Sequence, residues 1–224
     1  MSVLVLAAFL AAPPVTLQLA RDQQDRPGLQ KIVDQAGAAA AKAPNDAEAQ
    51  YQMALASSYL AEVALEQGDK KLAQQAAERG VKAAEQSVSL KPQVAEYYRV
   101  LGTLCGQIVP ANVFAGLGYA KRAREAIDKA IALDPKSSMA HMARGVGNYY
   151  IPAALGGGFD LATADFRKAI DLDANNADAW LWLGMSLRKE NKNAEARQAF
   201  TKSLELNPKR TWAAQQLEKT APTP

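Results

Sequence analysis

Cysteine and histidine are almost absent from this chain of 224 residues, which contains one of each, Cys105 and His141. One cysteine excludes an intramolecular disulfide framework and a zinc site built from several thiolates. One histidine argues against a catalytic metal site, because such sites commonly use two or three imidazoles. The sequence therefore predicts no bound metal and no other cofactor.

An excess of charge of one sign is also missing. The chain has 26 Lys and Arg against 23 Asp and Glu, a formal net charge of +3, and both signs are mixed along nearly every segment. A nucleic-acid-binding protein usually carries a basic stripe or patch, so no nucleic-acid partner is expected. Hydrophobic residues make up 49% of the chain, which is near the globular average and argues against disorder over most of its length.

Recognisable catalytic motifs are lacking as well. Neither a phosphate-binding G-x-x-x-x-G-K-[ST] loop nor a G-x-G-x-x-G turn after a strand occurs. His141 and Cys105 stand where the helical pattern described below usually has a bulky apolar residue, so packing is the favoured role for both. The sequence therefore predicts a protein that is not an enzyme. Catalysis would require a polar pocket around Arg99, His141 or Cys105.

The first twenty residues contain no charged side chain. Their apolar run, Val3 to Ala12, is much shorter than the ~20 residues that a membrane-spanning helix needs, so no stable transmembrane span is expected. Its length is typical of a secretory signal, which predicts export to the periplasm or the cell exterior. The alternative is an unstructured tail over residues 1–20 of a cytoplasmic protein, because no Lys or Arg precedes the run and Pro13 follows it.

Helix-forming residues dominate the chain beyond residue 28, and no segment there has the pattern of a strand. The clearest pattern, over residues 177–208, has two sets of residues at helical spacing and then a proline: Trp180, Leu183, Gly184 and Leu187; Ala196, Phe200 and Ser203; Pro208. Small residues let two helices cross closely, large ones fill the grooves, and the proline ends the second helix. This spacing resembles the tetratricopeptide repeat (TPR), which implies an all-α, right-handed α-α superhelix.

Weaker copies of the same pattern precede this one. They predict four helix pairs, with one unpaired helix before them and a short capping helix, Thr211 to Lys219, after them. A cap is expected because a terminal unit of a repeat array cannot bury both of its faces. The expected organisation is a single TPR domain over residues 28–219, with repeats at about 46–92, 94–135, 137–174 and 177–208, and a tail at 220–224.

Three of the four copies carry extra residues at the turn between their two helices, which places all three insertions on one edge of the superhelix. Insertions confined to one face often mark a binding face. The first remains helix-forming and predicts longer helices. The second and third are apolar but broken by Gly and Pro, so they are expected either to cover a ligand or to pack against the solenoid edge. The lid candidates are Val113, Phe114, Leu117, Pro152 and Leu155.

In the tetratricopeptide family, the first helix of each pair lines the concave groove. Transferred to this chain, that pattern implies a groove rich in Tyr, Met and aliphatic residues, with Arg99 as the cation near its centre. Such a lining suits an apolar peptide segment or an acyl chain, although the same spacing is also typical of a packed core. The candidate groove residues are Tyr51, Leu55, Tyr59, Arg99, Thr103, Gln107, Met142, Val146, Tyr149, Tyr150, Leu181 and Met185.

The segment around the third insertion is similar to two groups of helical-repeat proteins, the periplasmic TPR components of tripartite solute transporters and the microtubule-dynamics-regulator family. The similarity rests on Pro152, Gly156 to Gly158, Ala162, Phe166, Lys168, Ala169 and Ile170. Those groups imply solute or lipid handling, or the organisation of partner proteins. The leading hypothesis is a scaffold that binds a protein or peptide segment in its groove. The alternative is a carrier for a lipid or another apolar small molecule beneath the insertions.

Overall fold

The computed structural model describes residues 16–111 and 113–221, but not the side chains of residues 113–117. Within these ranges the chain forms eleven α-helices and one short 3₁₀-helix, η1 (Ala153–Leu155), and it contains no strand. The all-α fold class that the sequence predicts is therefore confirmed.

Four helix pairs make up the body of the molecule. They are α3 (Ala47–Glu66) with α4 (Lys70–Leu90), α5 (Ala95–Ala111) with α6 (Val113–Leu133), α7 (Ser138–Tyr150) with α8 (Phe159–Leu172), and α9 (Ala177–Lys189) with α10 (Asn193–Leu206). Two helices, α1 (Leu17–Asp22) and α2 (Arg26–Lys42), precede them, and α11 (Thr211–Glu218) follows them. The predicted pairs, the unpaired helix α2 and the capping helix α11 are all present, and α1 is additional.

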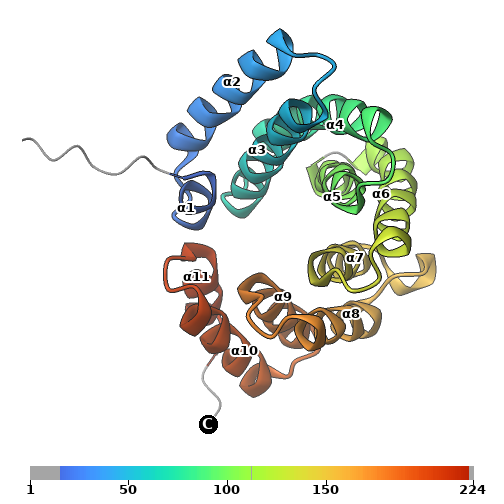
Figure 1. Cartoon of the computed structure of the whole chain (residues 1–224). Helices are drawn as coiled ribbons and strands as arrows, with labels where there is room; N and C mark the ends of the chain where they lie inside the picture. Colours follow the sequence, from blue (N-terminus) through green and yellow to red (C-terminus); the bar gives the residue numbers. More distant parts are fainter. Residues whose placement is uncertain (1–15, 112, 222–224) are drawn as a thin grey trace, which may run out of the picture.

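The pairs stack in chain order into a superhelix that curls nearly into a ring (Figure 1). The first helix of each pair, α3, α5, α7 and α9, lies on the inner side, and α4, α6, α8 and α10 lie on the outer side. Helices α1 and α11, from opposite ends of the chain, face each other where the ring closes. The curvature follows from the small rotation that each repeat adds to the one before.

Glycines allow close crossing within the pairs. A Cβ atom added at Gly184 of α9 would lie 2.6 Å from a ring carbon of Phe200 in α10, and one added at Gly145 of α7 would lie 2.6 Å from a ring carbon of Phe166 in α8. Both rings are fully buried. Any larger residue would push the helices apart, so these glycines fix the short separation that the repeat pattern predicts.

Capping side chains begin the inner helices of the first and last repeats. The Asp46 carboxylate accepts a hydrogen bond from the Glu48 N–H at 2.9 Å at the start of α3. The Asn176 side-chain oxygen accepts one from the Ala179 N–H at 3.0 Å at the start of α9. Each cap satisfies a backbone donor that the first turn of a helix leaves unpaired.

The first two insertions lengthen helices. Around the first, α3 has 20 residues and α4 has 21, as predicted, and Gly68 turns the chain between them with a φ of +78°. The second insertion was expected to be a broken loop, and that expectation is wrong, because α5 continues through Pro110 and α6 begins at Val113. Ile108 in this segment is fully buried, and such burial offsets the hydrogen bond that Pro110 removes.

The third insertion forms a loop that follows α7 and contains η1. Gly156 and Gly158 adopt positive φ values of +81° and +113°, which favour glycine. The Gly158 N–H donates to the carbonyl of Asn148 at 2.9 Å and so ties the loop back to α7. The glycine cluster therefore makes a tight return from α7 into α8.

Helix α1 begins inside the range that the sequence assigns to a leader or tail. Residues 17–20 are helical, and Ala20 is fully buried, so the start of the folded domain moves to the N-terminal side of residue 20. Thr16 caps this helix by accepting a hydrogen bond from the Leu19 N–H at 3.2 Å. The apolar run from Val3 to Ala12 lies outside the described residues. No helix in the described part of the chain is long and apolar enough to cross a membrane.

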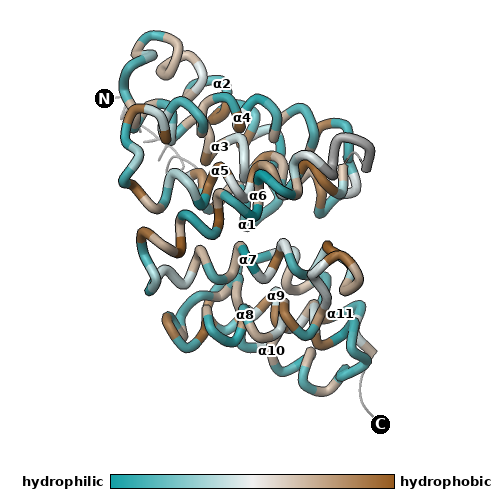
Figure 2. The backbone as a smooth tube through the Cα atoms, turned by 90° about the vertical axis from the view of Figure 1, so that its right-hand side faces the viewer, coloured by the Kyte–Doolittle hydropathy of each residue, from teal (hydrophilic) through white to brown (hydrophobic). Residues whose placement is uncertain are grey.

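Buried apolar residues form two clusters, one in each half of the ring. The first cluster draws on α1 to α5 and the second on α7 to α11. Figure 2 shows the two halves one above the other, with α2 to α5 in the upper half and α8 to α11 in the lower half. The chain passes from one half to the other at the turn between α6 and α7, residues 134–137.

Candidate functional site

A hollow of about 180 Å³ lies on the inner side of the ring, where the two halves meet. Helices α3, α5, α6 and α7 supply most of its wall. Arg21 of α1, Asp178 and Trp182 of α9, and Trp212 of α11 also line it. We call it the central hollow. Ile127, Met142 and Val146 give much of the wall an apolar character.

Two glycines widen the central hollow. Gly106 of α5 and Gly147 of α7 both line it, and a Cβ atom added at either one would meet no other atom within 4 Å. Glycine inside a helix costs roughly 0.5–1 kcal/mol relative to alanine. No close helix crossing requires glycine at these two positions, in contrast to Gly184, so their effect is to leave space in the hollow.

Two polar atoms on this wall have no hydrogen-bond partner. They are Thr103 Oγ1 and Gln107 Oε1, both buried and both on residues that line the hollow. Gln107 is held in place because its Nε2 donates to the backbone carbonyl of Ser58 at 3.0 Å. A buried polar atom without a partner is unfavourable, and both of these atoms belong to residues on the wall of the hollow.

Arg99 lines the hollow but is already paired. Its Nη2 donates to Glu96 Oε1 at 2.5 Å and its Nε donates to Glu96 Oε2 at 2.7 Å, and the residue is 7% exposed. Burial alone would lower the pKa of Arg99, but the hydrogen bonds to Glu96 and the negative charge of Glu96 act together against burial, and the pKa lies above the usual value. Arg99, the cation expected near the groove centre, is therefore already paired with a carboxylate of the protein, Glu96.

An aromatic cluster lies beside the hollow, and three of its members, Tyr150, Trp182 and Trp212, line the hollow. The Trp182 ring lies 5.2 Å from that of Trp212 and 5.6 Å from that of Tyr149, both in edge contacts. Tyr150 contacts Tyr149 at 5.1 Å and is 43% exposed. Such rings present a large, rigid apolar surface together with the polar O–H and N–H groups of Tyr and Trp.

The structure brings seven of the twelve candidate groove residues to the central hollow. These are Tyr59, Arg99, Thr103, Gln107, Met142, Val146 and Tyr150. The other five do not line it: Tyr51, Leu55, Tyr149, Leu181 and Met185.

Four of the five residues outside the hollow lie on the inner helices of the first and last repeats, α3 and α9, whereas Tyr149 lies on α7 with its ring 5.6 Å from that of Trp182. Leu181 and Met185 are buried in the second apolar cluster together with Trp212 of the capping helix. Tyr51 stacks on Tyr97 at 5.1 Å and donates its hydroxyl hydrogen to Glu96 at 3.1 Å. The first and last repeats thus use these positions for packing against the rest of the protein.

The lid candidates do not enclose the hollow where the structure describes them. Leu155 is 66% exposed, Pro152 is exposed, and neither lines the hollow. The side chains of Val113, Phe114 and Leu117 lie outside the described residues. The third insertion therefore contributes Tyr150 and Ile151 to the wall of the hollow, whereas Pro152 and Leu155 lie away from it.

Trp182 and Trp212 line the hollow, and the sequence pattern misses both. The family pattern selects Leu181 and Met185 on α9, whereas the residue that reaches the hollow is Trp182. Trp212 arrives from α11, which follows the last repeat and has no counterpart in the pattern. The available signal was the presence of a large aromatic residue in each of two neighbouring predicted helices.

The residues that could have suggested catalysis serve packing and pairing. Cys105 is fully buried, and burial raises the pKa of its thiol to about 11. His141 is 7% exposed, with Nε2 3.1 Å from the Pro135 carbonyl oxygen. Asp165 accepts a hydrogen bond from Arg144 at 2.6 Å, which links α8 to α7. No group of three or more potential metal ligands occurs within residues 16–111 and 113–221.

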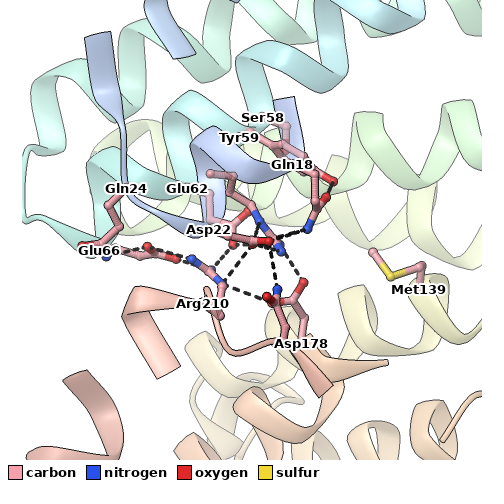
Figure 3. A network of polar contacts seen from close by, with 12 residues as sticks. Gln18, Asp22, Gln24, Ser58, Tyr59, Glu62, Glu66, Met139, Asp178 and Arg210 are labelled. Carbon is pink, nitrogen blue, oxygen red and sulfur yellow. Dashed lines mark hydrogen bonds and ion pairs between the residues drawn. The ribbon is translucent and has the colours of Figure 1, made fainter. Parts of the chain in front are cut away.

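A network of buried ion pairs joins the two ends of the ring (Figure 3). Arg21 of α1 donates to Asp178 of α9 at 2.6 Å, although the two are 157 positions apart in the sequence. Arg210, directly before α11, donates to Glu62 of α3 at 2.6 Å and pairs with Glu66. We call Arg21, Asp22, Glu62, Glu66, Asp178 and Arg210 the terminal clasp.

The clasp is buried and carries more carboxylates than guanidinium groups. The Arg210 side chain is 0% exposed and that of Glu66 is 3% exposed. Burial, and secondarily Glu62, raises the pKa of Glu66 to about 7 against the opposing effect of Arg210. Burial would also raise the pKa of Asp178, but Arg21 and Arg210 together outweigh burial and lower that pKa. The two arginines thus hold the ends together while leaving one carboxyl poised to take up a proton.

Two protein-family models match parts of this chain. The family model described as regulator of microtubule dynamics protein 1-3 matches residues 17–153, more than half of the chain. The chain belongs to this family. Its match begins at helix α1 and ends within the third insertion. A tetratricopeptide-repeat model matches residues 156–211, which contain the last two outer helices and α9. Together the two matches confirm the TPR resemblance and the microtubule-dynamics-regulator resemblance.

Solved structures of low sequence identity align with this chain. The TPR protein TTC0263 of Thermus thermophilus aligns with a TM-score of 0.62 and 22% identity, over 90% of this chain and 97% of that one. MamA of Desulfovibrio magneticus RS-1, residues 41 to the end, aligns with a TM-score of 0.48 and 19% identity, over 87% of this chain and 97% of that one. The first alignment establishes that this regulator-family chain is a TPR solenoid.

Proposed function

We propose that this chain is a non-catalytic binding protein whose central hollow takes an apolar segment of a protein partner. The observation that carries the proposal is the hollow itself, which combines aromatic wall residues with two unpartnered buried oxygens, Thr103 Oγ1 and Gln107 Oε1. A peptide segment would match both of these features. Its apolar side chains would fill the hollow, and its backbone N–H groups would donate hydrogen bonds to the two oxygens.

The family supports a binding role. Its description names the regulation of microtubule dynamics for the proteins it was drawn from, which is an action on a partner assembly. TPR folds serve other proteins as extended concave binding surfaces. In this chain α1 and α11 occupy the two ends of the concave side, which confines the partner to the centre.

A carrier for a lipid or another apolar small molecule is the second candidate. The apolar wall around Ile127, Met142 and Val146 favours it, because such a surface would also accept an acyl chain. A hydrocarbon tail, however, has no hydrogen-bond donor for Gln107 Oε1, whereas a peptide backbone does. A peptide therefore matches the hollow better than an acyl chain.

Partner capture with hollow-filling variants tests the proposal. Gly106→Leu should place its side chain in the hollow and abolish capture of a specific partner, whereas Gly106→Ala adds little volume and should retain it. Ala132→Leu adds comparable bulk on the exposed side of α6 and serves as the matched control. Capture that is the same for Gly106→Leu as for the unmodified protein would exclude the hollow as the binding site.

Native mass spectrometry of the purified protein separates the two candidates. A mass that equals the polypeptide alone is expected if the ligand is a protein segment. A co-purifying apolar molecule that is absent from Gly106→Leu would support the carrier instead.

We also propose that the protein is exported, on the basis of the uncharged apolar run from Val3 to Ala12. Because α1 begins at Leu17 and supplies Arg21 to the terminal clasp, processing should leave Thr16 in the mature chain. N-terminal sequencing of protein from separated cell fractions measures this. An intact Met1 in a cytoplasmic fraction would contradict export.

A further inference from the structure

The terminal clasp connects parts of the chain that no repeat-to-repeat contact brings together. Asn207 donates to Asp22 at 2.9 Å across 185 positions, and Gln215 donates to Gln24 at 3.1 Å across 191 positions. A solenoid needs no such contact, because each repeat packs only on its neighbours. The contact between first and last helices is therefore an added feature of this ring.

The clasp is polar, whereas each half of the ring is built around a cluster of buried apolar residues. The two apolar clusters lie on either side of it, one in α1 to α5 and the other in α7 to α11. Breaking the clasp would leave the pairs in each half packed as before. The turn between α6 and α7, which connects the halves, lies on the other side of the ring (Figure 1). The ring thus has a connection that can act as a hinge opposite a closure made of charges.

Clasp residues also form part of the wall of the central hollow. Arg21, Glu62, Glu66 and Asp178 all line it, beside Trp182 and Trp212. Any separation of the two ends would move these residues apart and widen the hollow on that side. The closure and the proposed binding site are therefore in direct contact.

We propose that the terminal clasp is a reversible closure, and that its opening about the turn between α6 and α7 controls access to the central hollow. The control of access rests on the function proposed above, whereas the opening itself does not. Buried ion pairs contribute little net stability, because removing the charges from water costs about as much as their attraction returns. They do specify one arrangement, and they respond sharply when one member changes its charge.

The charge balance makes the closure sensitive to protonation. Four carboxylates, Asp22, Glu62, Glu66 and Asp178, surround two guanidinium groups, which leaves two negative charges in excess when all are ionised. Uptake of a proton by one carboxyl removes half of that excess. A lower pH within the neutral range should therefore tighten the clasp.

Glu66 is the group that takes up the proton. It faces Arg210 before α11, Glu62 on its own helix, Gln24 from the turn after α1, and Tyr150 from α7. Its pKa of about 7 in the closed ring exceeds the usual 4.5, so closure binds a proton more tightly than the open form does.

Distance measurement by double electron–electron resonance tests the closure without any partner. Spin labels would be attached at Gln35→Cys in α2 and Thr201→Cys in α10, both exposed, with buried Cys105 replaced by alanine. The unmodified clasp should give a short distance at pH 5.5 and a broader distribution with a longer component at pH 8. Arg210→Gln should give the longer distance at both pH values.

Control variants keep the test decisive. Arg79→Gln removes an exposed ion pair with Asp34 outside the clasp and should leave the distances unchanged. Glu66→Gln should hold the short distance at both pH values, which provides a readout even if Arg210→Gln fails to fold. A pH response that persists in Glu66→Gln, or a folded Arg210→Gln with the short distance, would overturn the proposal.

Access to the hollow is measured in a separate experiment, through the fluorescence of Trp182 and Trp212, which line it. Collisional quenching of tryptophan fluorescence by acrylamide should increase in Arg210→Gln, or in the unmodified protein at pH 8 relative to pH 5.5. If the distance lengthens while quenching stays constant, control of access is wrong. Loss of partner capture in Gly106→Leu with no pH response of the distance would support the proposed function and reject the clasp.

Discussion

At the residue scale, the roles of residues that follow the repeat pattern could be predicted from the sequence, and the roles of residues outside that pattern could not. Gly184 was predicted to lie where two helices cross closely, and the structure places the ring of Phe200 against it. Gly106 and Gly147 carry no such signal, because a glycine that opens space has no partner at a fixed spacing. Arg99 was expected near the centre of the groove and lines the hollow, but its pairing with Glu96 one helical turn earlier depends on side-chain conformation.

Substitution of Gly184 by valine tests the close crossing. The added side chain would collide with the buried ring of Phe200, so the free energy of unfolding should fall by roughly 1–3 kcal/mol from overpacking. Chemical denaturation followed by circular dichroism measures the change. Gly106→Ala is the comparison, since it adds a methyl group in open space and should raise stability by up to about 1 kcal/mol. Equal stability of Gly184→Val and the unmodified protein would contradict the crossing.

At the element scale, helices with a periodic pattern were predictable and helices without one were not. The four pairs, α2 and α11 follow from apolar spacing and from Pro and Gly at their boundaries. Helix α1 has six residues, too few to show a period, and it lies next to an apolar run that resembles a leader. The second insertion was mispredicted because Pro110 reads as a helix breaker, whereas burial of neighbours such as Ile108 keeps it helical.

The capping helix should depend on Trp212. This side chain is 7% exposed and contacts Trp182 at 5.2 Å, so Trp212→Ala should cost about 3 kcal/mol or more and detach α11. Thermal denaturation and proteolysis near residue 210 measure both effects. Trp180→Ala is the control, because Trp180 is only half-buried and its N–H bonds to the Ala174 carbonyl at 3.0 Å. A smaller loss for Trp212→Ala than for Trp180→Ala would contradict this role.

At the scale of the whole molecule, ring closure could not be read from the sequence. The charges that close the ring are spread from Arg21 to Arg210, and none of them belongs to the repeat pattern. Whether these charges come into contact depends on the rotation that accumulates over four repeats, and that rotation cannot be read from the sequence. An open concave groove was therefore the natural expectation, and the structure replaces it with a confined hollow.

Stability should depend on pH through Glu66. Its pKa in the folded protein, about 7, lies above the usual 4.5, so its contribution is fully present below about pH 4.5 and is lost as pH rises through about 7. Asp178, with a lowered pKa, contributes above its usual 3.8 and loses that contribution only as pH falls through its lowered pKa. The melting temperature should accordingly be higher at pH 5.5 than at pH 8.

Glu66→Gln should flatten this dependence, because glutamine does not titrate. Glu218→Gln, on the exposed part of α11, is the matched control and should keep the slope of the unmodified protein. Scanning calorimetry from pH 5 to pH 8 measures both variants. A slope that survives in Glu66→Gln would assign the pH response to other groups.

The three tryptophans allow the most direct test of the central claim, that the hollow is the binding site. Trp182 and Trp212 line it and Trp180 does not, so each indole N–H gives a separate NMR signal from a known place. On addition of the captured partner, the signals of Trp182 and Trp212 should shift while that of Trp180 stays fixed. Saturating binding that leaves the Trp182 and Trp212 signals in place would show that the partner binds elsewhere.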